Sequence, residues 1–415
     1  MYNIIMSLMR LGIIIGSLWN KKLRLKRRGD LEAFRILRQK VDPDAKYVWV
    51  HAASLGEFEQ GRPIIEYIKK HSPEYKVLLT FFSPSGYEVR KNYEGADIIT
   101  YLPVDTLFNS HYFLHLIRPE LALFIKYEFW YNYLHILKRR NIPVYSVSSI
   151  FRPNQVFFKW YGREYAYVLK CFTKFFVQNE ESRLLLEDIG ITNVKVTGDT
   201  RFDRVMQIAD ESRTLQLVEC FKDSKKTFVA GSSWLPDEEI FIPYFSHHKE
   251  WKMIIAPHVI DEDHLRQIQT LLSGRRVLRY TEVLKKHTRG QKGFSSELQK
   301  DLQEAEVLII DCFGLLSSIY KHGEVAYIGG GFGVGIHNVL EAAVWSMPVI
   351  FGPNHQKFQE AVQLKETGGG MSISNSEEFA AVMKRLDDPV ELLRASEAAG
   401  KYVKEHSGAT EAIFE

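Results

Sequence analysis

Residues 325–345, VAYIGGGFGVGIHNVLEAAVW, carry the pattern that decides the fold class. A short apolar strand runs into Gly329, Gly330 and Gly331, and a helix is expected to start near Asn338. A strand that passes through a glycine-rich turn into a helix is typical of strand–helix–strand units with a parallel sheet. The stretch therefore predicts an α/β protein.

The same alternation of strands and helices extends to both sides of this stretch. It starts near residue 46, is interrupted by a polar segment at 198–215, and resumes near residue 226. We interpret the polar segment as a crossing between two similar α/β domains with a cleft between them. Expected strands include YVWVHAA (47–53), KVLLTFF (76–82), LALFIKY (121–127), KTFVAGSS (226–233), KMIIAPHV (252–259) and VLRYTEV (277–283).

Composition narrows the class of protein. The chain has 415 residues, of which 45% are hydrophobic and 25% charged, as in globular proteins. A net charge of +3 gives no support for a nucleic-acid partner. The three cysteines are far apart, so the sequence predicts neither a disulfide framework nor a zinc site, and a reducing cytoplasm is the simplest compartment. The polar segment 285–300 is expected to be a mobile loop.

Residues 2–19, YNIIMSLMRLGIIIGSLW, predict attachment to a membrane. A helix of this length spans about 27 Å, barely a bilayer core, and Arg10 disfavours a spanning segment. Asn3, Ser7, Arg10 and Ser17 share one face, which favours a helix in the interface with this polar stripe toward water. The alternatives, a spanning helix and a buried helix of the soluble domain, stay open. The basic residues that follow, Lys21, Lys22, Arg24, Lys26, Arg27 and Arg28, predict contact with anionic lipid on the cytoplasmic side.

Turns after strands are where ligands are expected, because open parallel sheets bind them beyond the carboxyl ends of their strands. In the glycine-rich turn, Gly330 and Gly331 let a backbone approach a phosphate, although a tight structural turn is an equal alternative. Asn338 and Glu341 have the spacing of a capping box. The functional interpretation of Glu341 is an acceptor for ribose hydroxyls.

Two further turns of the second half are candidates for the same ligand. In AGSSW (230–234), Gly231, Ser232 and Ser233 can offer amides and hydroxyls to a phosphate, or cap a helix. His258 follows the next strand and is either a ligand to base or phosphate or a structural histidine. His355 and Lys357, in FGPNHQKF, have the same two interpretations.

The first half offers a candidate catalytic group. In HAASLGEFEQG, Ser54 and Glu57 have capping-box spacing, and the functional alternative makes Glu57 a general base that takes a proton from an acceptor hydroxyl. The acceptor-side candidates are Ser54, Ser85 in the turn SPSG (83–86), and Glu128 after another strand. For Glu128 a buried structural carboxylate is the alternative.

Seven segments, in this order, resemble one family, the 3-deoxy-D-manno-octulosonic acid (Kdo) transferases of lipopolysaccharide assembly. They are HAASLGE (51–57), SPSG (83–86), EFW (128–130), GDTRFD (198–203), GSSW (231–234), GGGFGVGIHNVLEAA (329–343) and PVIFGPNHQKFQEA (348–361). HAASLGE followed later in the chain by the glycine-rich segment is specific to this family, and the other five segments support the resemblance. The resemblance covers nearly the whole chain.

The resemblance implies a GT-B fold, with two Rossmann-like domains whose parallel sheets face a central cleft. It implies an inverting transfer from CMP-Kdo to a lipid A precursor (lipid IVA) at the cytoplasmic face of the inner membrane, with no required metal and no cofactor. Glu57 matches the family's proposed base. The positions that match its donor-binding residues are Gly231, Ser232, Gly330, Gly331, Asn338 and Glu341.

We therefore predict a membrane-associating segment at 1–30, an acceptor domain at 31–207 and a donor domain at 208–415, whose last helix can pack back on the first domain. Two departures from the family bear on the site. His258 follows Ala256-Pro257 directly, where the family often has Arg-His, and Arg201 stands where lysine is commoner. Arg201 either neutralises the leaving phosphate or pairs with Asp203, and Arg152 is a further candidate for the donor's acidic groups. A GT-B enzyme that uses a UDP-sugar, and a silent nucleotide-sugar binder, are the alternatives.

Overall fold

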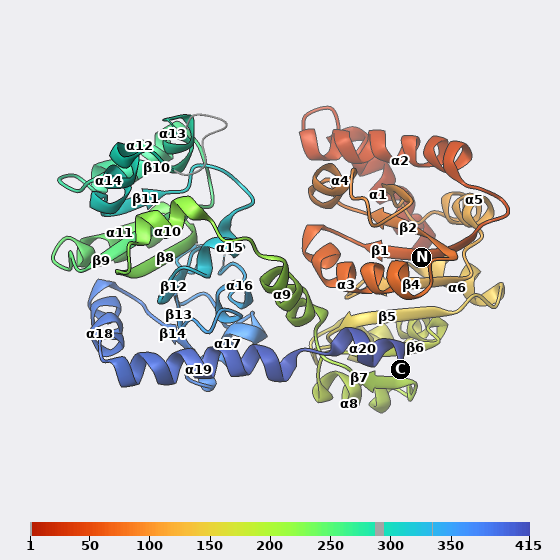
Figure 1. The fold of residues 1–415 in the computed structure, drawn as a ribbon. Helices are drawn as coiled ribbons and strands as arrows, with labels where there is room; N and C mark the ends of the chain where they lie inside the picture. The colour runs from red at the N-terminus through yellow and green to blue at the C-terminus, as the bar shows by residue number, and fades with distance from the viewer. Residues whose placement is uncertain (1, 287–293, 334) are drawn as a thin grey trace. The chain divides into compact units, whose positions relative to one another are not determined.

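The chain divides into two compact units, each built around one seven-stranded parallel sheet (Figure 1). The computed structural model describes residues 2–286, 294–333 and 335–415. One unit comprises Met1–Arg204 with Ser407–Glu415, and the other Val205–His406. The predicted α/β class with two Rossmann-like domains is confirmed. The predicted boundary at residues 207/208 lies inside helix α9 (Thr200–Glu211), which also contains the division between the units.

The first sheet has the strand order β3-β2-β1-β4-β5-β6-β7. Its strands are β1 (Lys46–Ala52), β2 (Tyr75–Phe81), β3 (Ile98–Tyr101), β4 (Leu121–Ile125), β5 (Val144–Ser149), β6 (Lys174–Val177) and β7 (Val194–Val196). The helices of this unit are α1 (Tyr2–Gly16), α2 (Lys21–Lys40), α3 (Leu55–His71), α4 (Pro84–Arg90), α5 (Leu107–Ile117), α6 (Tyr131–Arg139), α7 (Arg163–Ala166), α8 (Glu180–Asp188) and α20 (Ala409–Phe414), with the 3-10 helices η1 (Val156–Phe158), η2 (Trp160–Gly162) and η3 (Tyr167–Cys171).

The second sheet has the order β10-β11-β9-β8-β12-β13-β14. Its strands are β8 (Lys226–Ser233), β9 (Trp251–Pro257), β10 (Val277–Arg279), β11 (Val307–Ile309), β12 (Val325–Ile328), β13 (Val349–Phe351) and β14 (Gly370–Ser372). The helices of this unit are α10 (Gln216–Lys222), α11 (Leu235–Phe245), α12 (Glu262–Leu271), α13 (Tyr280–Lys286), α14 (Ser296–Glu304), α15 (Leu316–Tyr320), α16 (Leu340–Ala343), α17 (Gln359–Glu366), α18 (Ser376–Leu386) and α19 (Pro389–His406).

Both faces of each sheet are covered, so the strands read as continuous apolar runs. In β1, every residue after Lys46 is buried. Trp49 packs with Phe113, Phe124 and Tyr133 on one face of the first sheet, and Val50 belongs to a second core cluster on the other face. This double burial gives the sequence its short Val/Ile/Leu/Phe-rich strands and fixes their side-chain register.

The strand order reverses at one place in each sheet, and these places locate the candidate sites. β1 pairs with both β2 and β4, and β8 pairs with both β9 and β12. The connections that leave β1 and β4 run to opposite sides, so their turns part and leave room beyond the strand ends. Glu57 follows β1 and Glu128 follows β4, while the two glycine turns follow β8 and β12.

The N-terminal helix α1 is attached to the first unit at its start. The Tyr2 hydroxyl donates to Asp105 Oδ2 over 2.7 Å, and the Asn132 side-chain amide donates to Asn3 Oδ1 over 2.8 Å. Ser17 is buried. The expectation that Asn3 and Ser17 face water is therefore wrong, because both find polar partners in the protein.

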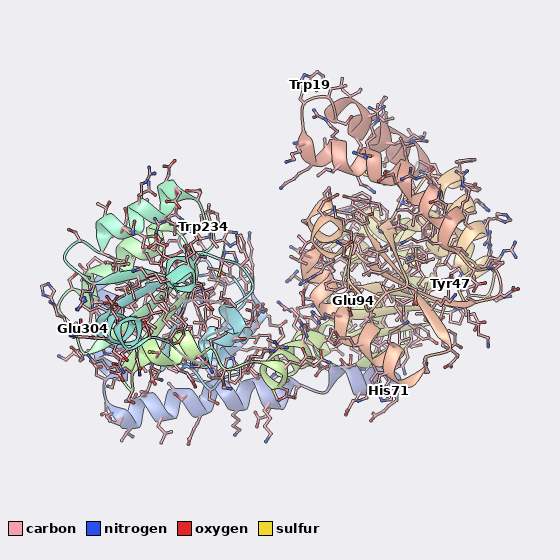
Figure 2. All side chains as sticks on the ribbon, turned by 45° about the horizontal axis from the view of Figure 1, so that its top comes forward. Trp19, Tyr47, His71, Glu94, Trp234 and Glu304 are labelled. Atoms are coloured by element: carbon pink, nitrogen blue, oxygen red, sulfur yellow. The ribbon has the colours of Figure 1, made fainter. Side chains whose placement is uncertain are left out.

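The outward face of α1 is apolar instead. Its exposed residues and those of the following turn are Ile4, Ile5, Leu8, Leu11, Ile14, Ile15, Leu18 and Trp19. Trp19, labelled in Figure 2, is 78% exposed. No single helix within the described ranges is long and apolar enough to cross a bilayer; α1 and α2 pass such a test only as a pair, with a bend of 119° between them.

Three local expectations differ from the structure. The strand expected at 277–283 ends at Arg279, because Asp311 accepts hydrogen bonds from the backbone and hydroxyl of Thr281 and α13 starts there. Of the loop expected at 285–300, residues 287–293 lie outside the described residues, and Ser296 begins α14, which buries Leu298. The polar crossing at 198–215 is largely helix α9.

Candidate functional site

Glu57 lies in the first turn of α3, half-buried, directly beyond the end of β1. Ser54 occupies the N-cap position, but its side chain accepts no capping hydrogen bond. Its hydroxyl donates instead to Glu57 Oε2. The capping-box interpretation of this pair is therefore wrong, and the hydroxyl orients the carboxylate.

The turn after β2 is fastened to the turn that carries Ser54. The backbone N–H groups of Phe82 and Ser83 both donate to the Ala53 carbonyl, over 3.2 and 2.7 Å. A Cβ on Gly86 would stand 2.3 Å from the Phe81 ring and 3.0 Å from the Ser54 carbonyl carbon, so only glycine allows this approach. The two turns form one surface, on which Ser85 is exposed beside Ser83.

Glu128 is held from two sides. Its Oε2 atom accepts a hydrogen bond from Trp130 Nε1 over 2.7 Å and lies 3.2 Å from His51 Nε2. His51 is fully buried and contacts the Thr80 hydroxyl through Nδ1. The Glu128 side chain keeps 16% of its surface exposed. Glu128 is thus a fixed acceptor with a small open face, and its contacts with His51 and Trp130 were not predicted.

A third group of residues surrounds the Tyr127 phenol. Arg152 Nη1 donates to the Tyr127 hydroxyl over 3.2 Å. Burial raises the pKa of Tyr127, the charges of Arg152 and Arg201 lower it, and the Glu57 carboxylate raises it. Two guanidinium groups and the candidate base therefore act on the same phenol, although the sequence analysis did not single out Tyr127.

Arg201 pairs with Asp199 and not with Asp203. Its Nη2 and Nε atoms lie 2.8 and 2.9 Å from Asp199 Oδ2. Burial alone raises the pKa of Asp199, but the charge and hydrogen bonds of Arg201, with a hydrogen bond from Gln60, outweigh burial and the pKa is lowered. Asp203 instead accepts hydrogen bonds from the backbone of Gly408 and Thr410, where α20 begins.

In the second unit, the turns after β8 and β12 touch backbone to backbone. A Cβ on Gly329 would stand 2.2 Å from the Ser232 carbonyl oxygen and 2.5 Å from Ser233 Cα. Ser233 donates its hydroxyl to the fully buried Glu238, which His264 also contacts over 2.9 Å. The Ser233 hydroxyl is thus committed to the interior, whereas Gly231 and Ser232 line the end of the strand.

Asp237 joins these two turns. This fully buried carboxylate accepts hydrogen bonds from the backbone N–H groups of Trp234 and Gly330 and from the Tyr327 hydroxyl, each over 2.9 Å. Burial raises the pKa of Asp237, and these hydrogen bonds partly oppose that rise. Gly330 thus gives its amide to Asp237, and the Gly335 carbonyl oxygen, 2.4 Å from where a Cβ would stand, fills the space left by its missing side chain.

Beyond the glycine turn, α16 starts at Leu340 with Val339 as its N-cap. The expected capping box is therefore wrong, and the helix is one turn long. The Asn338 side-chain amide donates to Glu341 Oε1 over 3.0 Å, and the Ser317 hydroxyl donates to Oε2 over 2.9 Å. Glu341 therefore carries hydrogen bonds from two neighbouring side chains of the second unit.

Three aromatic rings stack beside this turn. His258 lies between Trp234, at a centroid distance of 4.7 Å, and His337, at 4.4 Å. Trp234 Nε1 donates to His337 Nε2 over 3.3 Å, so that nitrogen carries no proton. Burial lowers the pKa of His258, and burial together with the His258 charge lowers the pKa of His337 to about 4. Trp234, His337 and Asp237 were not predicted; their order along the chain gave no sign of their proximity.

Glu57, Arg152 and Arg201 belong to the first unit, where the charge of each affects the Tyr127 phenol. Gly231, Gly330, His258 and Glu341 belong to the second unit, and His355 is buried with Nδ1 toward the Gly352 carbonyl and the Ser372 hydroxyl. Among the residues that the structure describes, no three His, Cys, Asp or Glu side chains are placed to share a metal ion.

Comparisons with known proteins show which proteins the chain is similar to. The family model of the 3-deoxy-D-manno-octulosonic-acid transferases (kdotransferases) matches residues 24–204. The 3-deoxy-D-manno-octulosonic acid transferase of Aquifex aeolicus is 27% identical over 348 residues, which cover 82% of this chain and 85% of that protein. Its counterpart in Rickettsia bellii is 26% identical over 350 residues, with coverages of 82% and 79%.

Among solved structures, UDP-GlcNAc 2-epimerase of Neisseria meningitidis bound to UDP-GlcNAc superposes with a TM-score of 0.61, at 16% identity, over 89% of this chain and 98% of that chain. This likeness concerns the fold alone, and the predicted GT-B class is confirmed. The predicted resemblance to the Kdo transferases is confirmed as well.

We expect Asp237→Asn to destabilise the second unit by about 1–3 kcal/mol, because an amide nitrogen would then face a backbone N–H donor in the interior. Urea unfolding of the full chain measures the effect. Glu239→Gln, on the exposed side of the same helix, is the matched control and should change the stability by less than about 0.5 kcal/mol. Equal stabilities of the two variants would contradict the role given to Asp237.

We expect His337 to titrate with a pKa of about 4. The folded pKa lies below that of the unfolded chain, so the stability that the neutral ring provides is present above about pH 6.5 and is lost as pH falls toward 4. Histidine NMR titration, with the resonance assigned by His337→Gln, measures this. A midpoint at 6 or above would show that the ring is not desolvated as described.

Proposed function

We propose, from the chain's relationship to the Kdo transferases, that it transfers a Kdo residue from CMP-Kdo to a lipid A precursor (lipid IVA) in lipopolysaccharide assembly. The observation that carries the proposal is Glu57, half-buried beyond β1 and oriented by the Ser54 hydroxyl. Without that orientation, the relationship would suggest a reaction but no group to start it.

In the proposed reaction Glu57 is the general base. The acceptor hydroxyl oxygen attacks the anomeric carbon of the sugar while the bond from that carbon to the phosphate oxygen of CMP breaks. The bonding electrons leave with CMP, and the hydroxyl proton passes to the Glu57 carboxylate. Attack from the face opposite the phosphate inverts the anomeric centre, which requires one base and no covalent intermediate.

The positive charge near Glu57 suits an acidic substrate. Arg152 and Arg201 both act on the Tyr127 phenol, as Glu57 does. Arg201 is bound on one side by Asp199 and so is held in place. We infer that one or both guanidinium groups contact the acidic groups of the donor, while Ser85 and Glu128 offer hydrogen bonds to the acceptor.

The second unit is proposed to bind the nucleotide. Ser232, half-buried near the end of β8, is proposed to offer its backbone and hydroxyl to the phosphate, while the buried Gly231, Gly330 and Gly331 let the neighbouring turns pack closely beneath it. Asn338 orients Glu341 toward a ribose hydroxyl, as the expected ribose contact requires. His258, in its ring stack, borders the same turns and can contact the base or the phosphate.

We propose further that the chain is held at the cytoplasmic face of the inner membrane through its N-terminal segment. The exposed apolar face of α1 supports this, since an isolated apolar face of that length has no partner within the described unit. Exposed Lys21 and Lys22 at the start of α2 add attraction to anionic lipid.

We expect Glu57→Gln to reduce Kdo transfer by about 10²-fold or more, because the amide cannot take the proton, while CMP binding stays within twofold. Mass spectrometry of the lipid product measures transfer, with CMP-Kdo and UDP-sugars supplied separately as donors. Glu94→Gln, an exposed residue of the same unit (Figure 2), is the control and should leave the rate unchanged. Near-normal turnover of the Glu57 variant would remove Glu57 from this role, and transfer from a UDP-sugar would exclude the proposed donor.

We expect the double variant Leu8→Asn/Ile15→Asn to weaken binding to anionic vesicles by at least about tenfold, since it removes two apolar side chains from the outward face of α1. Co-sedimentation of the full chain with vesicles measures this. Leu393→Asn, at an exposed leucine of the second unit, should not change it. Unchanged binding of the double variant would count against attachment through α1.

A further inference from the structure

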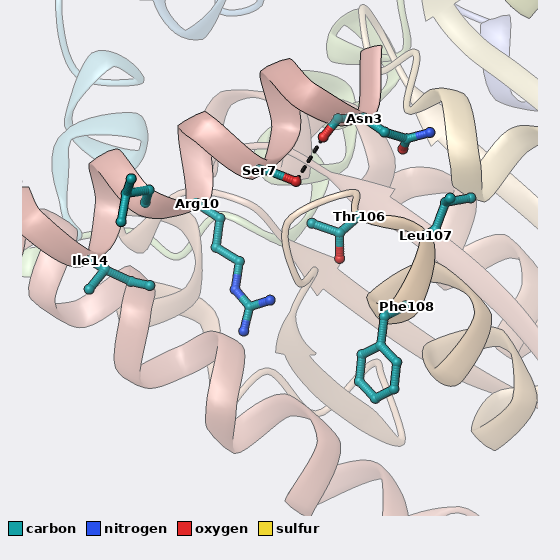
Figure 3. Close-up of a pocket in the computed structure, with 8 residues that line it drawn as sticks. Asn3, Ser7, Arg10, Ile14, Thr106, Leu107 and Phe108 are labelled. Atoms are coloured by element: carbon teal, nitrogen blue, oxygen red, sulfur yellow. Dashed lines mark hydrogen bonds between the residues drawn. The ribbon is translucent and has the colours of Figure 1, made fainter. Parts of the chain in front are cut away.

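A hollow of about 480 Å³ lies between α1 and the start of α5 (Figure 3). Arg10 extends from α1 into it, opposite Thr106 and Phe108. Leu11 and Leu107 complete the apolar part of its lining. The hollow thus combines one permanently charged group with a largely apolar wall, a lining that matches an amphipathic ligand.

Arg10 makes no hydrogen bond or ion pair with any residue that the structure describes. Burial raises the pKa of Asp30, the charge of Lys26 and then that of Arg10 oppose the rise, and Asp30 already pairs with Lys26 over 2.5 Å. A guanidinium group carries five N–H donors and cannot lose its charge, so an anion with several oxygens is the partner that it fits.

Part of the basic segment that follows α1 is bound by the protein. Arg24 donates to the carbonyls of Ser17 and Leu18, Lys26 donates to Leu102 and Asp30, and Arg27 donates to Ser17 Oγ. Of these three cations Lys26 is buried, whereas Arg24 and Arg27 remain exposed. The attraction of the segment to lipid stays a prediction, and Arg10 differs from the segment in lining the hollow.

A second donor faces the same ligand. The Thr106 hydroxyl accepts a hydrogen bond from the Asn109 backbone over 3.3 Å, which leaves its own hydrogen free to donate. The Ser7 hydroxyl already donates its hydrogen bond to the Asn3 carbonyl over 2.8 Å. An anion in the hollow would thus meet Arg10 from one wall and Thr106 from the other.

The apolar lining continues onto open surface. Phe108 is 71% exposed and Leu107 is 53% exposed, and Leu11 connects them with the outward apolar face of α1. A free phosphate or a nucleotide would leave these side chains in water. A phosphate that carries acyl chains would cover them, because its chains can lie along the same face.

We propose that this hollow binds the phosphate headgroup of one anionic bilayer phospholipid, with Arg10 and Thr106 as donors and the acyl chains along Leu11, Leu107 and Phe108. The proposal rests on membrane attachment, and it is independent of the reaction catalysed. Tyr2 and Asn3, at the start of the same helix, bond to Tyr131 and Asn132, just after the Glu128 loop. A lipid held at Arg10 would therefore set how deep the loop that carries Glu128 lies at the bilayer surface.

The test measures binding of dihexanoylphosphatidylglycerol, kept below its micelle concentration, to the full chain by NMR titration. We expect saturable binding, weakened about tenfold or more by Arg10→Gln, as for the loss of a charge-assisted hydrogen-bonded pair. Arg28→Gln is the matched control: it removes the same charge from an exposed position outside the hollow and should stay within twofold. Arg10 is exposed and unpaired, so its variant keeps the contacts of the fold.

Three results would overturn the proposal. Equal losses for Arg10→Gln and Arg28→Gln would mean general charge attraction without a site. Unchanged lipid binding together with a raised KM for the glycolipid acceptor in Arg10→Gln would mean that the hollow receives the acceptor. Absence of saturable binding would mean that no headgroup site exists. Membrane attachment is tested separately, by binding of the wild-type chain to vesicles. If the chain failed to bind vesicles, attachment would be refuted, and the short-chain titration would still decide whether the site exists.

Discussion

Parallel strands deliver all their carboxyl ends to one edge of a sheet, and every group assigned a chemical role here depends on that geometry. In the first sheet the strand order reverses between β1 and β4, so the turns that follow these two strands run in opposite directions. Glu57 follows β1 and Glu128 follows β4. The second sheet repeats the arrangement with β8 and β12. Because the space beyond the strand ends arises from the strand order, it does not depend on the sequence of the turns. The residues of the turns can therefore differ according to the reaction or ligand.

Space alone does not give a defined site, and in both units buried polar groups fix the turns. Asp237 accepts two backbone N–H groups from two different turns, so neither turn can move without leaving a donor unpaired in the interior. In the first unit, the Ala53 carbonyl accepts two N–H groups from the neighbouring turn. These contacts explain why Gly86 and Gly329 have no side chain: each stands where another backbone or ring already lies.

The sequence predicted what is local and missed what is distant. Apolar runs and glycine turns sufficed for most of the strands, the two compact units and the resemblance to the Kdo transferases, and Ser54 and Glu57 are close in the chain and in space. The partners of Glu128 were missed because His51 lies 77 residues away. One of the two alternatives for Arg201 was pairing with Asp203, two residues ahead, but α9 turns that carboxylate toward Gly408 and Thr410, and Asp199 pairs with Arg201 instead. Spacing identifies candidates for a pair, and the path of the backbone selects among them.

The same reasoning applies to the N-terminal helix, where the prediction of its polar side failed in an informative way. Asn3 and Ser17 were expected to face water, but the protein supplies them with Asn132 and the cations of α2. Once those polar groups turn inward, the apolar face of α1 turns outward, and its side chains have no partner in the described unit. Arg10 shares the polar stripe, and among the described residues it makes no hydrogen bond or ion pair, because Asp30, on which its charge acts, is bound by Lys26. A helix whose polar residues are satisfied by the protein and whose apolar residues are left exposed is anchored on one side only, and the bilayer is the surface that would complete it.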